Sequence, residues 1–410
     1  MRLAEVFQRA VGGDGSVGFS AFDGSEAGPR DAAVRIEVRT PEALSYLASA
    51  PGELGLARAY VTGHLEIVGD VHRALAHLSD MSLRDLPWRQ RVELLSTLGR
   101  TRLATRVEVP AQERRLRGLR HSKARDREAI AHHYDVSNTF YEWVLGPSMT
   151  YTCAVYPTAS STLEEAQAAK HDLVARKLGL RPGMRLLDVG CGWGGMVMHA
   201  AREYGVRALG VTLSRNQAEW AQKAIVEAGL SDLAEVRHLD YRDVRDNGFD
   251  AISSIGLTEH IGKAKLPAYF RSLHRKLKPG GRLLNHCITR ADNRQRARTG
   301  GFIDRYVFPD GELVGPGHIV SLVHDHGFEV RHEENLREHY ALTLAAWCRN
   351  LDDNWDDAVS EIGLARARVW RLYLAASRLG FERNDIQLHQ VLGVKLDGAD
   401  AHYPLRPTWP

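Results

Sequence analysis

The sequence is poor in three features that define large classes of proteins. It has four cysteines in 410 residues, too far apart for a disulfide framework or for the usual spacing of metal ligands. No segment has the roughly 18 consecutive apolar residues of a membrane-spanning helix, and the first residues lack the apolar core of a secretory signal. We therefore expect a cytoplasmic protein without a metal site, at most peripherally associated with the inner face of the membrane. The cysteines are Cys153, Cys191, Cys287 and Cys348.

A large excess of charge of one sign is also absent. The formal net charge is +3, which excludes a protein whose whole surface attracts polyanions. The charge is locally uneven, because ten lysines and arginines lie between Arg100 and Arg127 against three acidic residues. This Arg100–Arg127 block could contact nucleic acid or anionic lipid headgroups, and a solvated linker is an equally good interpretation.

The chain divides into three predicted parts. Residues 1–80 are typical of a small α+β domain: residues 33–39 alternate as in a half-buried strand, and Thr40-Pro41 marks the start of a helix. Residues 81–127 are predicted to be a basic helical connector. Residues 128–410 form the predicted catalytic domain, in which eight aromatic or histidine side chains between positions 132 and 156 favour the wall of a pocket.

From residue 185 onward, strand and helix patterns alternate. Apolar runs predict strands at 185–189, 207–212, 236–239, 249–255 and 282–288, and the segments between them predict helices that end near 204, 228 and 277. This alternation predicts an α/β fold with a doubly wound, Rossmann-like parallel sheet.

A glycine-rich turn, Asp188-Val-Gly-Cys-Gly-Trp-Gly-Gly195, follows the first of these strands. Glycines at this point let a ligand approach the backbone. A dinucleotide site requires an acidic residue about 20 positions later, whereas the second strand ends in Gly210–Ser214 without one. Here the acidic residue precedes the glycines, which is the pattern of S-adenosylmethionine (SAM) methyltransferases. SAM has a cationic amino group and sulfonium and no phosphate, so it suits a carboxylate such as Asp188.

Several further motifs resemble those of the cyclopropane-fatty-acyl-phospholipid synthase family. They occur in the family's order over most of residues 130–390, and the preceding part looks like the additional, lipid-carrier-like domain of the longer bacterial members. The matching segments are His133–Ser137, Met149–Ala154, Leu187–Gly195, Val211–Gln217, Glu259–Gly262, His286–Ile288, Asp304–Pro309 and His339-Tyr340.

The resemblance implies an enzyme with two cofactors, SAM and bicarbonate. Together with Asp188, the residues implied for SAM are Tyr151, Gly190, Gly192, Thr212, Leu213, Gln217, Asp240, Tyr241 and Arg242. The residues implied for a bicarbonate ion beside the reacting carbons are Cys153, Glu259, His286, Ile288 through its backbone, and Tyr340.

The implied reaction is methylation of the cis double bond of an unsaturated acyl chain in a phospholipid. The π electrons attack the sulfonium methyl group and leave a carbocation, which aromatic side chains shield from water before bicarbonate removes a proton. Proton loss from the new methyl group closes a cyclopropane, and loss after a hydride shift gives a methylene branch. Candidate shielding residues are Tyr134, Phe140, Tyr151, Trp193, Tyr306 and Phe308.

Two departures from the family pattern bear on the product. Ser377 stands where several bacterial synthases have a cysteine, which puts a catalytic role for that position in doubt. Ile255–Thr258 replaces a bulkier segment before Glu259, and with Phe22–Ser25 it looks more like the actinobacterial relatives that make methylene branches.

Two other functions stay open at this point: a small-molecule N- or C-methyltransferase, and a catalytically inactive lipid-binding protein. The expected partners are a phospholipid with unsaturated acyl chains and, through the Arg100–Arg127 block, an anionic membrane surface, without nucleic acid. A homodimer and a partner reductase that acts on the product stay open as well.

Overall fold

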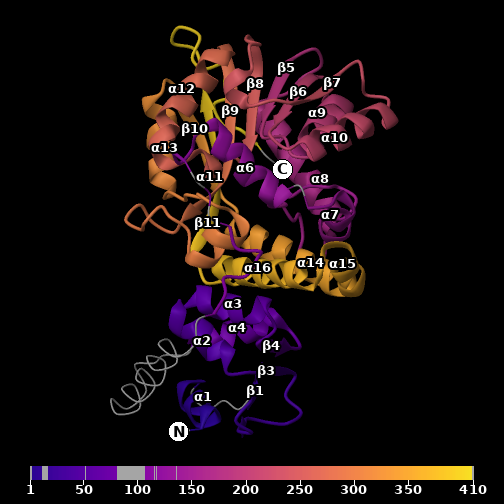
Figure 1. Ribbon diagram of the computed structural model, residues 1–410. Coiled ribbons are helices and arrows are strands. Elements are labelled where there is room, and N and C mark those ends of the chain that lie inside the picture. The colour runs from indigo at the N-terminus through magenta and orange to yellow at the C-terminus, as the bar shows by residue number, and fades with distance from the viewer. Residues whose placement is uncertain are drawn as a thin grey trace. The chain divides into compact units, whose positions relative to one another are not determined.

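The structure, a computed structural model (Figure 1), describes residues 2–11, 17–50, 52–80, 107–114, 116, 118–134 and 136–408. The chain forms two compact units. Unit 1 comprises Met1–Arg115, Gly300–Val307 and Leu351–Leu379, and unit 2 comprises Leu116–Thr299, Phe308–Asn350 and Gly380–Pro410. The chain thus returns to unit 1 twice after leaving it. The domain limits predicted at residues 80 and 127 stay a prediction, and residues 81–106 of the predicted connector lie outside the described residues.

Unit 1 is built on a small mixed sheet with the strand order β2-β1-β3-β4. β1 (Val17–Ala21) is parallel to β3 (Val34–Val38), while β2 (Glu26–Ala27) and β4 (Leu65–Val68) are antiparallel to their neighbours. In β3 the valines and the isoleucine are buried and the charged residues between them are half-buried, so the predicted alternation is confirmed. The helices are α1 (Leu3–Val11), α2 (Glu42–Ser49), α3 (Glu53–Val61), α4 (Val71–Asp80), α15 (Trp355–Ile362) and most of α16 (Leu364–Glu382).

Two buried arginines join parts of unit 1 that are distant in the sequence. Arg58 of α3 donates from Nε and Nη2 to the two carboxylate oxygens of Glu113, at 2.8 and 2.9 Å. This bidentate geometry satisfies both oxygens of a carboxylate that has no contact with water. Arg368 of α16 pairs with Glu66 of β4 and donates to the carbonyl oxygen of Tyr60. The late segment Leu351–Leu379 is therefore tied by ionic contacts to the N-terminal sheet.

Unit 2 contains, in its described residues, a seven-stranded sheet in the order β10-β11-β9-β8-β5-β6-β7. The five strands from β9 to β7 are parallel, and β11 and β10 extend the sheet in antiparallel pairs. The predicted doubly wound α/β fold is confirmed. The strands are β5 (Arg185–Val189), β6 (Arg207–Thr212), β7 (Ala234–His238), β8 (Phe249–Ile255), β9 (Leu277–Arg290), β10 (Glu329–Asn335) and β11 (Ile386–Val394).

The order of the strands reverses between β5 and β8. The chain runs from β5 outward through β6 to β7, and then crosses to β8 and β9 on the other side of β5. Open α/β sheets bind ligands at such a point, in the crevice beyond the carboxyl ends of the strands. The topology therefore locates a candidate site after residues 189 and 255.

Two layers of helices cover this sheet (Figure 1). α8 (Leu163–Leu178), α9 (Gly195–Tyr204) and α10 (Arg215–Glu227) form one core with Leu186, and α12 (Leu266–Lys276) and α13 (Pro316–Asp325) form the other with Leu187 and Val189. Because side chains alternate along a strand, Asp188 faces the same side as Leu186. The remaining helices are α6 (Lys123–Tyr134), α7 (Asn138–Leu145), α11 (Thr258–Ile261) and α14 (Arg337–Asp353).

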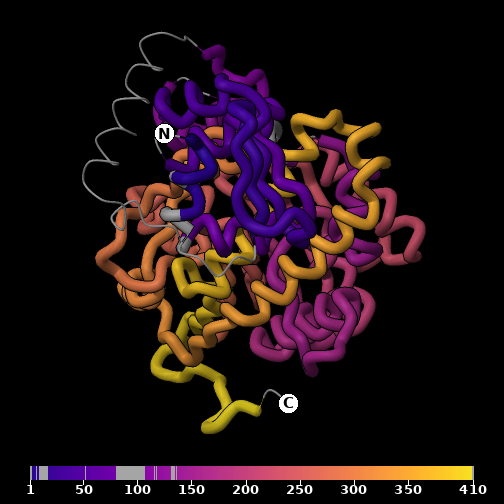
Figure 2. The backbone as a smooth tube through the Cα atoms, turned by 90° about the horizontal axis from the view of Figure 1, so that it is seen from below, coloured from indigo at the N-terminus to yellow at the C-terminus, as the bar shows by residue number. Residues whose placement is uncertain are grey.

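The C-terminal residues leave the body of unit 2 as a short tail (Figure 2). Tyr403 lies beneath Arg282, whose guanidinium carbon is 5.0 Å from the centre of its ring. Leu405 beyond it is fully exposed. The tail is thus attached at Tyr403 and contributes nothing to the candidate site.

Candidate active site

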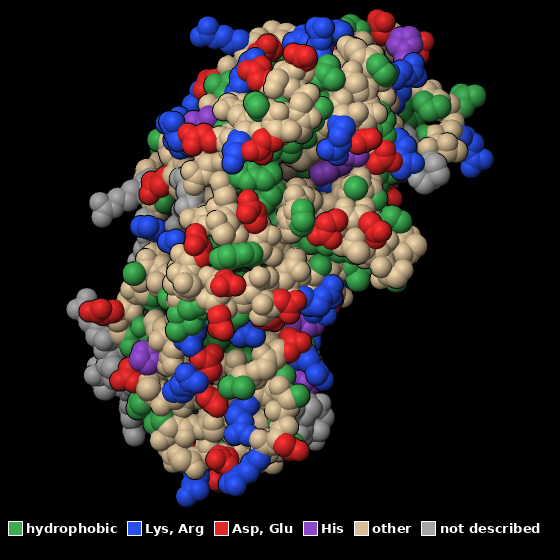
Figure 3. All heavy atoms as spheres, turned by 90° about the vertical axis from the view of Figure 1, so that its right-hand side faces the viewer, with side chains coloured by type: hydrophobic (Ala, Val, Ile, Leu, Met, Phe, Trp, Pro, Cys, Tyr) green, Lys and Arg blue, Asp and Glu red, His purple; other side chains and the backbone are tan. Residues whose placement is uncertain are grey.

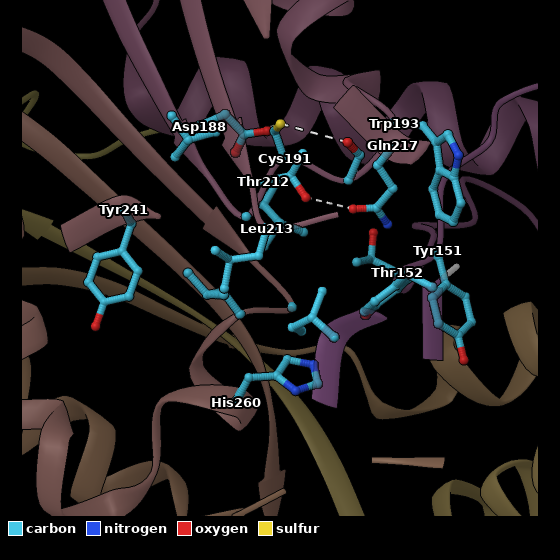
Figure 4. Close-up of a pocket in the computed structure, with 18 of the residues that line it drawn as sticks. Tyr151, Thr152, Asp188, Cys191, Trp193, Thr212, Leu213, Gln217, Tyr241 and His260 are labelled. Carbon is cyan, nitrogen blue, oxygen red and sulfur yellow. Dashed lines mark hydrogen bonds between the residues drawn. The ribbon is translucent and has the colours of Figure 1, made fainter. Parts of the chain in front are cut away.

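A cavity of about 1180 Å³, including its open mouth, lies in unit 2. Its lining includes Gly190 after β5, Thr212 at the end of β6 and Gly256 after β8, so it occupies the reversal point of the sheet. Figure 4 shows side chains around an open space, with Tyr151 and Trp193 on one side and Tyr241 on the other. A cavity at this position in the sheet suits a nucleoside-containing ligand.

The glycine loop forms the wall between β5 and α9. The backbone N–H groups of Gly190 and Cys191 both donate to the carbonyl oxygen of Val211 in β6, at 2.9 and 3.0 Å. Gly190 has a φ of +75°, and a Cβ atom there would lie 3.1 Å from the side chain of Leu257. Gly192 has a φ of +56°. Both backbones line the cavity in a conformation that other residues rarely adopt.

Asp188 is a buried carboxylate in the cavity lining. Its Oδ1 atom accepts a hydrogen bond of 2.7 Å from the Ser253 hydroxyl in β8. Burial raises its pKa to about 6, although the Ser253 hydrogen bond and the charge of Lys170 act in the opposite direction. A cationic ligand group would favour the ionised form, so the position suits the amino group of SAM.

The end of β6 and the start of α10 supply the next part of the wall. The Thr212 hydroxyl donates to Gln217 Oε1 at 2.7 Å, and the Ser214 hydroxyl caps α10 by accepting from the Gln217 backbone at 3.2 Å. In Figure 4 the amide nitrogen of Gln217 points toward the open space. Thr212, Leu213 and Gln217 all line the cavity, and they present hydroxyl and amide groups in place of the carboxylate of a dinucleotide site.

Asp240 lies behind the cavity wall. It is buried and accepts from the backbone and the guanidinium of Arg242, which also pairs with Asp126 of α6. Burial opposes ionisation, but the hydrogen bonds and charge of Arg242 outweigh it and hold the pKa of Asp240 below its usual value. Tyr241 and Arg242 line the cavity and Asp240 does not, so Asp240 orients Arg242.

Aromatic side chains close one end of the cavity. The rings of Tyr134 and Tyr151 lie 6.0 Å apart, and the ring of Tyr134 lies 6.2 Å from Trp193. Trp193 is anchored by its indole N–H, which donates to Asn138 Oδ1 at 3.0 Å. Tyr134, Tyr151 and Trp193 line the cavity, whereas Phe140 and Phe308 are not part of its lining and Tyr306 belongs to unit 1.

The predicted bicarbonate residues begin with Glu259 and His286, which are both buried. Glu259 Oε1 accepts from the Ile288 N–H at 2.7 Å, and His286 Nδ1 lies 3.2 Å from the amide nitrogen of Gln390. Glu259 Oε2 and His286 Nε2 have no hydrogen-bond partner in the part of the chain that the structure describes. Burial raises the pKa of Glu259 to about 7 and holds the pKa of His286 well below its usual value.

Cys153 and Tyr340 lie nearby through shared backbone contacts. The Cys153 thiol lies 3.8 Å from the carbonyl oxygen of Leu336, which also accepts from the Tyr340 N–H. The Leu336 N–H in turn donates to Leu388, the register partner of Ile288 across β9 and β11. Burial raises the pKa of the Cys153 thiol, which therefore keeps its proton. The structure thus connects all five predicted residues around one end of the β9–β11 pair.

Many residues that line the cavity are missing from the predicted site, among them Thr152, Lys170 and His260. Thr152 lies inside a matching motif, and His260 follows Glu259 in another. Lys170 has a weaker signal in the sequence, because it occupies the same helical face as Ala166 and Val174, four residues away on either side. The side chains of Ala166, Lys170 and Val174 are all buried.

The fold and the cavity together define a SAM-dependent methyltransferase. More narrowly, the chain belongs to the mycolic acid cyclopropane synthetase family, whose model matches residues 121–391. It is similar to a probable fatty acid methyltransferase, Rv3720, of Mycobacterium tuberculosis, with 56% identity over 99% of this chain and 97% of that protein. The Escherichia coli (strain K12) cyclopropane-fatty-acyl-phospholipid synthase is 36% identical over 63% of this chain and 66% of that protein.

A solved structure gives the same assignment. The mycolic acid cyclopropane synthase CmaA1, complexed with SAH and CTAB, has a TM-score of 0.61 and 33% identity, and the match covers 65% of this chain and 97% of that one. The predicted family membership and SAM-dependent methyltransferase activity are confirmed. The assignment of individual residues to SAM and bicarbonate stays a prediction.

Proposed function

We propose that the protein methylates the cis double bond of an unsaturated acyl chain in a phospholipid, giving a cyclopropane ring or a methylene branch. The names of two relatives support a lipid substrate, since one is a probable fatty acid methyltransferase and the other a cyclopropane-fatty-acyl-phospholipid synthase. The observation that carries the proposal is the pair of buried atoms Glu259 Oε2 and His286 Nε2, neither of which has a partner among the described residues.

These two atoms fit a bicarbonate ion. Because Gln390 donates to Nδ1 of the neutral His286 ring, the remaining ring proton is on Nε2, which is then a free donor. Glu259 Oε2 supplies an acceptor, and the Cys153 thiol, which keeps its proton, lies against the carbonyl oxygens of Ala154 and Leu336. A buried polar atom without a partner costs about 1–3 kcal/mol, and a small bound oxyanion would offset that cost.

We assign Cys153, Glu259, His286, Ile288 and Tyr340 to holding this ion. The Ile288 N–H already donates to Glu259 Oε1, so this backbone group acts by orienting the carboxylate. When bound, bicarbonate supplies a base for the proton that leaves the methylated chain. The side chains themselves then need only to position the ion, which agrees with a neutral His286 and a thiol that keeps its proton.

On the other side of the site, we assign the cavity to SAM, which supplies an electrophilic methyl group when bound. Asp188 attracts the amino group, the backbones of Gly190 and Gly192 allow close approach, and Thr212, Leu213 and Gln217 contact the ribose and adenine. Tyr241 and Arg242 lie near the adenine, and Asp240 positions Arg242. The family resemblance implies these roles, and the presence of all these residues except Asp240 in the cavity lining supports them.

The aromatic end of the cavity has the chemistry that a cationic intermediate requires. A double bond that attacks a methyl group leaves positive charge on the neighbouring carbon, and water would trap that cation as an alcohol. Tyr134, Tyr151 and Trp193 present ring faces or edges that exclude water and attract positive charge. Trp193 is almost fully buried, and Tyr134 and Tyr151 are half-buried.

The decisive experiment supplies the protein with SAM, bicarbonate and dioleoyl phosphatidylglycerol. We expect mass spectrometry of the acyl chains to show a gain of one CH2, and NMR to distinguish a ring from a methylene branch. Glu259→Gln keeps an acceptor for the Ile288 N–H but removes the charge, so we expect it to lower the rate at least 100-fold with unchanged affinity for S-adenosylhomocysteine.

The matched control is Glu219→Gln, because Glu219 is an exposed residue of α10 and should leave the rate unchanged. An acyl chain that gains no mass in the wild-type reaction would exclude the proposed substrate. Full activity of Glu259→Gln would exclude the proposed bicarbonate site while leaving the substrate in place.

We also propose that the protein acts at an anionic membrane surface through the Arg100–Arg127 block. Residues 100–106, 115 and 117 lie outside the described residues. Of the described part, Arg120 and Arg125 pair with Asp310 and Lys123 pairs with Asp243, whereas Arg127 is exposed. The face in Figure 3 intersperses basic and acidic side chains and offers no continuous basic surface. Among the described residues, no helix is long and apolar enough to cross a bilayer.

A further inference from the structure

A buried lysine of α8, Lys170, lines the cavity without a charged partner. Its side chain is almost inaccessible to solvent, and its ammonium donates to the Thr152 hydroxyl at 2.9 Å. Among the described residues this is its one hydrogen bond, and no carboxylate forms an ion pair with it. An ammonium can donate three hydrogen bonds, so two of its donors are available to a ligand.

A second buried lysine of α8, Lys177, has the hydrogen-bond and ion-pair partners that Lys170 lacks. Lys177 pairs with Glu334 and donates to Gln390 Oε1 at 2.7 Å. It lies outside the cavity lining. Because buried charges are normally paired, the isolated ammonium of Lys170 requires an explanation that Lys177 does not.

The charges around Lys170 indicate what would pair with it. Asp188 lines the same cavity, and its carboxylate favours the charged form of Lys170, against its burial. His171, His199 and His286 lie near Lys170, and burial together with its charge holds their pKa values low. One wall of the cavity therefore presents a carboxylate and an ammonium to the same ligand.

We propose that Lys170, together with the Thr152 hydroxyl, binds the α-carboxylate of the methionine part of SAM, while Asp188 binds its α-amino group. An α-amino acid is a zwitterion, and these two side chains have the complementary charges. Lys170 and Thr152 line the cavity whereas Cys153 and His286 do not, which favours the donor's carboxylate over bicarbonate as the anion. The proposal rests on SAM as the methyl donor and does not depend on the lipid substrate.

The test compares two ligands that differ only in the carboxylate. We expect the wild-type protein to bind S-adenosylhomocysteine about 10- to 100-fold more tightly than its decarboxylated analogue, S-adenosyl-3-thiopropylamine, in calorimetric titrations without lipid. Lys170→Met should remove this preference by weakening the first ligand alone. Lys170→Arg, which keeps the charge, should restore part of it. Lys177→Met is the matched control for loss of a buried lysine from α8 and should keep the preference.

Three results would overturn the proposal. If the wild-type protein binds S-adenosylhomocysteine and its decarboxylated analogue equally well, the proposal is wrong, and this result does not require Lys170→Met to fold. Equal weakening of both ligands by Lys170→Met shows a structural role. Unchanged binding of S-adenosylhomocysteine, with a raised bicarbonate requirement in the methylation assay, assigns Lys170 to the bicarbonate ion. Because the titrations contain no lipid, the first two results do not bear on the proposed acyl-chain substrate.

Discussion

Asp188 and Lys170 have opposite charges, and burial affects their pKa values in opposite directions. Burial raises the pKa of Asp188 to about 6 and lowers the pKa of Lys170 to about 7. Near neutral pH each group is therefore close to losing its charge in the free protein. A zwitterionic ligand favours the charged form of both, so ligand binding and protonation are coupled at this wall.

We expect the affinity for S-adenosylhomocysteine to fall as the pH decreases through about 6. Below its pKa Asp188 is protonated in the free protein and no longer attracts an ammonium group, so binding must first release a proton, which costs up to tenfold in affinity per pH unit. The ligand's own carboxyl and amino groups titrate outside the range of about pH 5 to 7. Titrations at several pH values in this range measure the effect.

Asp188→Asn is the control for this pH dependence. It keeps the hydrogen bond to Ser253 and all the histidines of the cavity but cannot ionise, so its affinity should be lower at neutral pH and flat on the acid side. An acid limb that persists in Asp188→Asn would show that a histidine of the cavity, and not Asp188, causes the pH dependence.

The glycine loop is the element whose backbone conformation matters most for the donor. Gly190→Ala places a Cβ atom against Leu257 at a φ of +75°, which costs about 1–2 kcal/mol in backbone strain alone. We expect it to weaken S-adenosylhomocysteine binding at least tenfold, because the loop must shift where the ligand approaches it. Calorimetric titration measures the affinity, and thermal unfolding measures the strain.

Gly229→Ala is a matched control for this prediction. Gly229 follows α10 with a φ of +67°, and a Cβ atom there meets nothing within 4 Å. It should lower the stability by a similar amount while leaving the affinity unchanged. If the two variants bind the ligand equally well, the loop conformation has no specific role in binding.

The sequence predicted the central strands well and missed the edge of the sheet. β5, β6 and β8 are apolar runs between turn signals, so their limits were found. β10 (Glu329–Asn335) is rich in charged residues because it lies at the edge of the sheet, with much of its surface exposed. β11 was missed as well, since its place beside β9 depends on a pairing that is distant in the sequence.

The SAM side and the bicarbonate side of the candidate site also differed in how well the sequence predicted them. Asp188, Gly190 and Thr212 follow from local pattern, because the carboxyl ends of neighbouring parallel strands meet at one edge. Cys153 and Tyr340 are far apart in the sequence and are brought together by tertiary contacts such as those to Leu336, so their grouping required a family resemblance. Lys170 was missed because a single buried lysine in a helix resembles any surface lysine in the sequence.

At the scale of the whole molecule, we expect the protein to bind phosphatidylglycerol vesicles and not phosphatidylcholine vesicles. Binding should weaken several-fold between about 0.05 and 0.5 M salt, since higher salt screens the attraction between basic side chains and the anionic surface. Arg127→Glu should weaken it further, and Arg181→Glu, the same change at another exposed position, should not. Vesicle sedimentation measures both effects, and binding that does not depend on salt would exclude the Arg100–Arg127 block.

The discontinuous course of the chain through unit 1 limits how this protein can be shortened. A chain cut after residue 115 would keep residues 351–379 but lose Glu66 and the Tyr60 carbonyl that satisfy Arg368. The N-terminal part therefore cannot be removed without disturbing residues 351–379. An insertion or deletion in it would affect a segment that lies more than 200 residues later in the chain.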